Sequence, residues 1–420
     1  MNLYGIIILV ALLLDNLLDL VADFLNLTAM RSDLPEEFTG VYDAESYRKS
    51  QEYTRVKTQF GIVTATVGLI AIFAFWFGGG FNLLDLSVRR FGFGPIPTGL
   101  AYIGILILLK SLLSLPFRIY DLFVIEQRFG FNRMTPVTFL SDLVKGTLLG
   151  LLLGGPLLAG ILFFFQFAGE LAWLYGWIAF TLFILFVQFI APTWIMPIFN
   201  KFTPLGEGAL KERILSYAGS VDFPVEQIYL IDGSRRSTKA NAFFSGFGRH
   251  KRIALFDTLI AKQTVPELVA ILAHEIGHYK KKHILLGMAF SIAHMGVMFF
   301  LLSLFLRQPG LYQAFYLVQP SIYAGLVFFG LLFTPVESVL SIFLHAFSRK
   351  NEYEADRFAV ETFEQPEAMV SALKKLAVDH LANLTPHPLH VILNDSHPPI
   401  LQRIRAIRRA MQAFHPGHVT

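Results

Sequence analysis

The sequence predicts an α-helical polytopic membrane protein with seven transmembrane helices and a polar domain on one side of the membrane. Hydrophobic residues make up 54% of the 420 residues, charged residues make up only 16%, and there are 42 phenylalanines. This composition is far too apolar for a water-soluble protein. Seven stretches are also long enough to cross the hydrocarbon core of a bilayer, which needs about 20 residues of helix.

The apolar stretches give the expected spans and the expected domains. The spans are expected near residues 3–25, 61–80, 98–116, 146–167, 172–194, 284–306 and 321–345. The first begins MNLYGIIILV, which lacks the positive segment and the cleavage site of a signal peptide, so we expect it to be retained. We predict an N-terminal membrane domain at 1–194 and a second domain at 195–420 that includes the last two spans.

The distribution of Lys and Arg predicts the orientation. The segments after the first and third spans carry most of these residues: Arg31, Arg48, Lys49, Arg55, Lys57, Arg118, Arg128, Arg133 and Lys145. The opposite side has only Arg89, Arg90 and Arg307. The positive-inside rule therefore places the first set in the cytoplasm, together with the polar regions of about 195–283 and 346–420.

Several ionisable residues lie inside the predicted spans. Asp15, Asp19 and Asp23 are spaced four residues apart and so form one stripe on one helix face. The others are Lys110, His294 and Glu337. Charges at membrane depth usually face a bundle interior or a water-filled cavity, so the stripe indicates a hydrated interior. The alternative is that some of these residues lie at the membrane interface.

Composition also restricts the cofactor and the partners. The chain contains no cysteine, so any metal must be held by His, Asp or Glu. The formal net charge is only +4, and no basic tract is interleaved with aromatic residues. We therefore expect the lipid bilayer, and no nucleic acid, as a partner.

The segment AHEIGHYKKKH at 273–283 contains the strongest functional motif. His274 and His278 are four residues apart, so on a helix both imidazoles can reach one zinc ion. Glu275 is placed beside that metal, where it can accept a proton from a water on the zinc. Thr264 and Glu267 form a predicted capping box at the start of this helix. The alternative is a helix at the membrane interface whose histidines have no functional role.

A third ligand is expected in the segment that follows the last span. A catalytic zinc needs three protein ligands and one open position. Glu352 and Asp356 are four residues apart in the sequence NEYEAD, on the same side of the membrane as the histidine pair. Glu352 can bind the zinc, while Asp356 can orient a ligand histidine. We assign Glu354 as a solvated acid, and His283 as a structural residue.

These motifs resemble those of the integral-membrane zinc endopeptidases called CAAX prenyl proteases type 1, of the gluzincin group. HExxH at 274–278 and ExxAD at 352–356 match that family's signature in order and spacing. The segments 241–246 and 251–257 resemble its substrate-edge segment, and SHPP at 396–399 followed by Arg403 resembles its C-terminal signature. The similarity runs through nearly the whole chain.

The resemblance implies further roles. His397 would donate a hydrogen bond to the oxyanion that forms during peptide hydrolysis. Arg403 would hold His397 or the carboxyl end of the substrate. An edge strand at Asn241 and Ala242 would pair with an extended peptide. One zinc ion per chain, held by the two histidines and the glutamate above, would be the cofactor.

The resemblance also implies an architecture and a substrate. Seven helices would enclose a chamber within the membrane, capped by a mainly helical zinc-peptidase domain with a small β edge. The substrate would be a prenylated protein cut near its C-terminus. The chain is compact and ends in HPGHVT, without a lysine-based retrieval signal, which favours a bacterial member in the inner membrane with its active site facing the cytoplasm.

Two alternatives stay open. A bacterium with no prenylated proteins would use the same chemistry in quality control, cutting misfolded or stalled membrane proteins without prenyl specificity. A zinc-binding transporter or sensor belongs to another class of function. Transport predicts ligands at the bilayer midplane, whereas the motifs here lie outside the spans, and Glu275 is surplus to simple binding.

Overall fold

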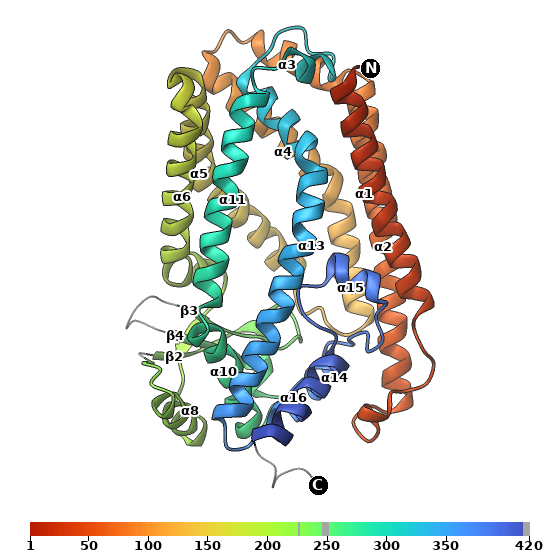
Figure 1. Cartoon of the computed structure of the whole chain (residues 1–420), viewed down its shortest axis with the longest axis vertical. Helices are drawn as coiled ribbons and strands as arrows, with labels where there is room; N and C mark the ends of the chain where they lie inside the picture. The colour runs from red at the N-terminus through yellow and green to blue at the C-terminus, as the bar shows by residue number, and fades with distance from the viewer. Residues whose placement is uncertain (226, 246–251, 415–420) are drawn as a thin grey trace.

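The computed structural model describes residues 1–225, 227–245 and 252–414. Long helices run from the end of the molecule that carries the N-terminus down to a compact polar domain, which lies at the bottom of Figure 1. Gly246, Lys251 and the terminal segment 415–420 lie outside the described residues.

Seven helices within the described residues are long and apolar enough to cross a membrane, as the sequence predicts. They are α1 (Leu3–Thr28), α2 (Ala44–Phe77), α4 (Pro95–Tyr120), α5 (Pro136–Phe167), α6 (Ala172–Ile190), α11 (His283–Phe305) and α13 (Ile322–Thr362). Helix α4 continues as a π-helix at Asp121–Glu126, and α6 continues as a π-helix at Ala191–Ile195 and then as α7 (Met196–Phe199).

Several of these helices extend beyond the predicted spans. Helix α2 begins at Ala44 rather than near residue 61, because the Asp43 side chain caps it by accepting a hydrogen bond of 2.8 Å from the Ser46 N–H. Helix α13 continues without a break past residue 345 to Thr362. Hydropathy detects only the apolar part of such a helix, so the polar extensions were missed.

An aromatic cluster closes the end of the molecule that carries the N-terminus. It joins the spans to the short helices α3 (Gly80–Arg89) and α12 (Pro309–Gln313). Phe315 stacks on Phe328 of α13 with a centroid separation of 3.9 Å, and Phe81 meets both rings edge-on. Trp76 of α2 donates a 2.7 Å hydrogen bond to the Ala314 carbonyl. Packing therefore fixes the helices firmly at this end.

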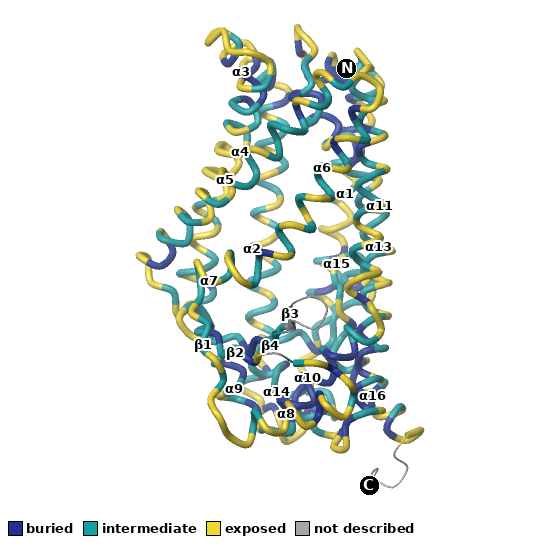
Figure 2. Tube along the Cα trace, turned by 90° about the vertical axis from the view of Figure 1, so that its left-hand side faces the viewer, coloured by how far each residue is buried: buried dark blue, intermediate teal, exposed yellow. Residues whose placement is uncertain are grey.

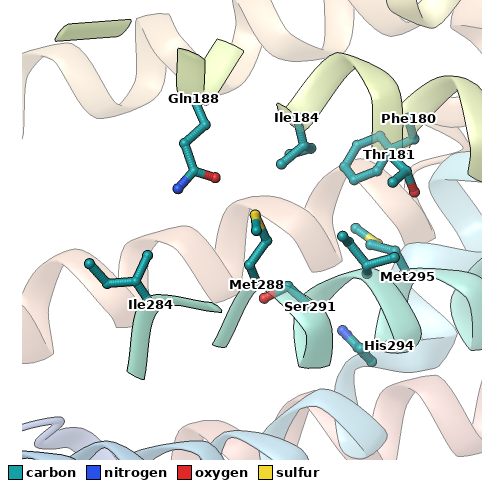
Figure 3. A pocket seen from close by; sticks show the side chains of 10 residues that line it. Phe180, Thr181, Ile184, Gln188, Ile284, Met288, Ser291, His294 and Met295 are labelled. Carbon is teal, nitrogen blue, oxygen red and sulfur yellow. The ribbon is translucent and has the colours of Figure 1, made fainter. Parts of the chain in front are cut away.

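Between this cluster and the polar domain, few residues of the spans are buried. In α2, α5, α11 and the extended α4 and α6, only 6% of the most apolar stretch is buried. A cavity of about 420 Å³ lies between α6 and α11, and Figure 3 shows Gln188 and Thr181 of α6 facing Met288 and Ser291 of α11 across it. Another, of about 660 Å³, lies between α11 and α13. The helices thus enclose space instead of packing into a solid bundle.

The intramembrane acids face the interior of this arrangement. Asp15 accepts a 2.5 Å hydrogen bond from the Ser338 hydroxyl of α13. Asp23 lies 3.3 Å from His390 Nδ1 on α15 (Pro388–Asn394), measured from its Oδ1 atom. Glu337 of α13 lies 3.2 Å from His294 Nε2 of α11. Asp15 and Asp23 of the acidic stripe on α1 thus contact other elements, whereas Asp19 between them is exposed.

The polar domain contains a small sheet and a helical core. Its strands are β1 (Phe202–Pro204), β2 (Gln227–Ile231), β3 (Ala242–Ser245) and β4 (Arg252–Phe256), in the order β1-β2-β4-β3. Strands β2 and β4 are parallel, and the other pairs are antiparallel. Its other helices are α8 (Ala209–Ser220), α9 (Asp257–Ile260), α10 (Val265–Lys280), α14 (Glu367–Asp379) and α16 (Ile400–Phe414). Buried residues concentrate in this domain, as Figure 2 shows in dark blue.

Candidate metal centre

Helix α10 carries the histidine pair and is fixed at its first turn. The capping box predicted from the sequence is present, with the Thr264 N–H donating to a Glu267 carboxylate oxygen at 2.7 Å. The same carboxylate accepts hydrogen bonds from Ser371 at 2.6 Å and from Lys375 at 2.7 Å, both on α14. The start of α10 is therefore satisfied and attached to a second helix.

Two small residues let α10 and α13 cross closely. A Cβ atom added to Gly277 would lie 3.1 Å from both the Cα and the carbonyl oxygen of Ala355, and 3.2 Å from Phe358 Cβ. Ala355 itself is fully buried. Gly277 directly precedes the second histidine of its motif, and Ala355 lies between the two acids of the other. The close crossing at these two residues therefore brings the two motifs together.

The predicted metal ligands converge at this crossing. His274 Nε2 lies 3.1 Å from His278 Nε2, while Glu352 approaches to 3.5 Å from the first and 3.3 Å from the second. All three ligand atoms lie within 4.8 Å of one another. Glu352 Oε2 is buried and makes no hydrogen bond within the described structure. Two imidazole nitrogens and a buried carboxylate fit a divalent metal well, and the Arg403 guanidinium lies 3.0 Å from the same Oε2 atom.

Asp356 and Arg403 contact His274 at Nδ1, the ring nitrogen opposite the one that faces the other predicted ligands. Asp356 Oδ1 lies 2.8 Å from His274 Nδ1, the ring nitrogen that faces away from the site. Arg403 donates to both Asp356 oxygens, at 2.6 and 2.9 Å, and its Nη1 lies 3.0 Å from Glu352 Oε2. Burial alone would lower the pKa of Arg403, but the two carboxylates outweigh burial and raise it above its usual value. The guanidinium is therefore a permanent buried charge.

The described contacts of Arg403 differ from those that we expected. We expected it to hold His397 or the carboxyl end of a substrate, but its described contacts are to Asp356, Glu352 and His274. Its side chain is buried, which is the usual condition for a residue that positions ligands. The sequence pattern located the residue, whereas its partners depend on how α16 packs against α13.

His278 has outer partners that sequence reasoning missed. His283 Nδ1 lies 3.1 Å from His278 Nδ1, and His283 Nε2 lies 3.1 Å from a carboxylate oxygen of Glu354. We expected His283 to be a structural residue and Glu354 a solvated acid. The available signal was weak, because His283 is simply a histidine at the start of the next apolar run.

The remaining predicted residues meet around one cavity of about 360 Å³, which Glu275, Asn241, Ala242, His397 and Arg403 help to line. The Glu275 side chain is half-buried and has no hydrogen bond or ion pair to a described residue. The exposed His397 places Nε2 at 3.4 Å from Glu352 Oε1. Glu275, His397 and the start of strand β3 thus line one cavity.

The edge strand is held from both sides at its start. The Asn241 carbonyl accepts a 3.1 Å hydrogen bond from the Phe256 N–H of β4. His380 Nε2 accepts a 3.1 Å hydrogen bond from the Ala240 N–H, so this histidine is neutral at that atom. Strand β3, which begins at Ala242, is the last in the sheet order and pairs with β4 along one side.

Known protein families and relatives match most of this chain. Residues 23–201 match the family described as CAAX prenyl protease N-terminal, five membrane helices, and residues 204–411 match peptidase family M48. A CAAX prenyl protease 1 homolog of Arabidopsis thaliana is 34% identical, over 92% of this chain and 93% of that protein. CAAX prenyl protease 1 of Saccharomyces cerevisiae is also 34% identical, over 89% of this chain and 88% of that protein.

A solved structure supports the same assignment. The crystal structure of S. mikatae Ste24p aligns with a TM-score of 0.91 at 30% sequence identity, covering 97% of this chain and 99% of that chain. These matches decide against the transporter or sensor alternative. The chain therefore belongs to the CAAX prenyl protease 1 family within peptidase family M48, and it is an integral-membrane metalloendopeptidase.

Proposed function

We propose that this protein is a zinc endopeptidase that cuts peptide bonds near the C-terminus of prenylated, CAAX-type protein substrates. The observation that carries the proposal is the single cavity shared by Glu275, His397 and the start of the edge strand, directly beside the three metal ligands. The names of the relatives, which are CAAX prenyl proteases, support the substrate class.

Zinc is the metal that this ligand set favours, at one ion per chain. His274, His278 and Glu352 supply two imidazole nitrogens and one carboxylate, which is the ligand set of catalytic zinc sites that keep a position open. When bound, zinc supplies Lewis acidity, which polarises a carbonyl group and favours ionisation of water at neutral pH.

Glu275 is assigned as the general base. Its carboxylate lines the cavity, has no described hydrogen-bonding partner, and follows the first ligand directly on α10. It can accept a proton from the attacking water and later deliver it to the leaving amine. His397 is assigned as the donor that stabilises the oxyanion, because its Nε2 lies at the mouth of the ligand cluster and its side chain is exposed to substrate.

The substrate is proposed to bind as an extra strand beside β3. Main-chain groups on the open edge of β3, which starts at Ala242 next to Asn241, would align an extended peptide by strand addition, with the scissile bond facing Glu275. The fixed backbone at Ala240 and Asn241 supports this role, since a template strand must be rigid to place a bond accurately.

The site is proposed to face the cytoplasm, as the distribution of Lys and Arg between the spans indicates. We further propose a domain boundary near residue 194, supported by the two family matches that meet between residues 201 and 204. Residence in a bacterial inner membrane also belongs to this proposal.

The test uses the purified full-length protein in detergent. Zinc per chain and cleavage of a farnesylated CAAX peptide and its unprenylated twin are measured for wild type, Glu275→Gln and Glu361→Gln. Glu361 is the matched control, because it lies on α13 and pairs with Arg357 instead of the site. We expect one zinc in each protein, with cleavage lost only in Glu275→Gln and faster for the farnesylated peptide. Equal cleavage of the two peptides would instead favour the quality-control role, and absence of zinc would refute the assignment.

A further inference from the structure

The two histidine ligands are supported in different ways. The outward nitrogen of His274 faces the Asp356 carboxylate directly, at 2.8 Å. The outward nitrogen of His278 instead faces another imidazole, His283, and only that second ring reaches a carboxylate, Glu354. The side chain of His283 is only 5% exposed, while that of Glu354 is 40% exposed.

The chemistry of a metal ligand fixes the protons along this chain of contacts. A metal binds a ring nitrogen that carries no proton, so Nε2 of His278 is unprotonated when the ion is bound and Nδ1 carries the proton. His278 Nδ1 therefore donates to His283 Nδ1, which must accept. His283 then carries its own proton on Nε2, which lies 3.1 Å from Glu354 Oε2 and can donate to it. Each nitrogen and oxygen in this series of contacts is therefore either a donor or an acceptor, with no conflict.

The turn between α10 and α11 has an uncommon backbone conformation. Lys282 has a φ of 60°, in the left-handed region, and His283 is the first residue of α11. A non-glycine residue in that region is uncommon and costs free energy. This turn ends α10, and the ring of His283 at the start of α11 lies next to that of His278. Figure 1 shows α10 and the start of α11 beside α13, which carries Glu354.

We propose that His283 and Glu354 form a relay that orients His278 and strengthens its bond to the metal. His283 is a positioning residue that acts through His278, and Glu354 completes it by holding the tautomer of His283. The other Glu354 oxygen lies 3.6 Å from Lys350 Nζ, which keeps the carboxylate near the relay. Outer partners of this kind typically contribute 10- to 100-fold to metal affinity. The inference rests on the proposed zinc site and adds residues to it.

The experiment measures zinc affinity, in full-length protein in detergent, by competition with a fluorescent chelator. His283→Leu removes the acceptor, whereas His283→Asn keeps an acceptor oxygen near the position of Nδ1. We expect His283→Leu to bind zinc about 10- to 100-fold more weakly than wild type, and His283→Asn to recover most of that loss. Glu354→Ala should also weaken binding, and Glu354→Gln should weaken it less, while Glu361→Gln should match wild type.

Thermal melting of the metal-free proteins separates positioning from folding. Equal melting of the two His283 variants, with unequal zinc affinity, supports the relay. Wild-type affinity in His283→Leu would overturn it, and equal losses in the Leu and Asn variants would assign His283 a packing role instead. If the wild-type protein binds zinc and cuts peptide while His283→Leu keeps wild-type zinc affinity, only the relay is refuted and the proposed function stands. A wild type that binds no zinc would overturn the proposed function as well.

Discussion

Replacing Gly277 by alanine tests whether the crossing of α10 and α13 sets the geometry of the metal site. The new Cβ atom would lie 3.1 Å from Ala355 Cα and oxygen, where ordinary contact requires 3.4–4 Å. Both helices would have to separate by a few tenths of an ångström, because the atoms that clash belong to backbone. Metal sites tolerate errors of only about 0.2 Å in ligand distance. The substitution therefore moves the histidines beyond the tolerance of the site.

Two opposing effects determine the stability of the metal-free protein. Overpacking costs about 1–3 kcal/mol, while replacing glycine by alanine inside a helix gains about 0.5–1 kcal/mol. We expect a net loss of about 0–2.5 kcal/mol in metal-free stability. Zinc affinity should fall at least tenfold, which corresponds to about 1.4 kcal/mol. Affinity is therefore expected to respond even where stability hardly changes.

Chelator competition and thermal melting with and without EDTA measure both quantities. Gly219→Ala is the matched control, since it lies in α8 and nothing would lie within 4 Å of its new Cβ. That variant should keep wild-type zinc affinity and melt at the same temperature or slightly higher. If Gly277→Ala also binds zinc as tightly as wild type, the close crossing does not set the ligand geometry and the reasoning is refuted.

Three further predictions concern side chains at or near the site. Glu275→Gln should retain zinc and lose at least about a hundredfold in kcat, and a smaller loss in a peptide assay would remove its role as base. Arg403→Met should lower stability by about 3–5 kcal/mol in urea unfolding, because it leaves the Asp356 carboxylate buried without its cation; an unchanged midpoint would contradict this. Burial raises the pKa of Glu267, but hydrogen bonds led by that from Lys375 outweigh burial and lower it. Its contribution to stability is therefore complete above its unfolded value of 4.5 and is lost as the pH falls through the lower folded value. Glu267→Gln should accordingly flatten the acid limb of a plot of stability against pH, and an unchanged limb would exclude it as a source.

The seven spans, and the histidine pair on one face of α10, were predictable from the sequence because both depend on local periodicity, whereas Glu352 was assigned from its motif and from the side of the membrane on which it lies. Apolar runs of sufficient length report a span, and a four-residue spacing reports a shared helix face. The start of α2 at Ala44 was not predictable by hydropathy, since its first turns are polar and stabilised by the Asp43 cap. The cap itself is a local signal that a closer search for helix starts would find.

The parts of the site that were missed depend on contacts between distant segments. His283 reaches His278 because Lys282 adopts a left-handed conformation that no residue type at that position announces. Arg403 was located by its motif, but its pairing with Asp356 requires α16 to pack on α13. Side-chain partners in three dimensions do not follow from spacing in one dimension.

Because α13 is one continuous helix, the number of its residues fixes how far the metal site lies from the opposite end of the molecule. One helix of 41 residues runs from the end that carries the N-terminus, past Ser338 at membrane depth, to Glu352 at the metal site. Each residue turns a helix by about 100° and advances it by about 1.5 Å. A single residue inserted between these two points would swing Glu352 to another face of the helix, away from both histidines. The number of residues between Ser338 and Glu352 therefore determines which way Glu352 faces, independently of the chemistry of the residues in between.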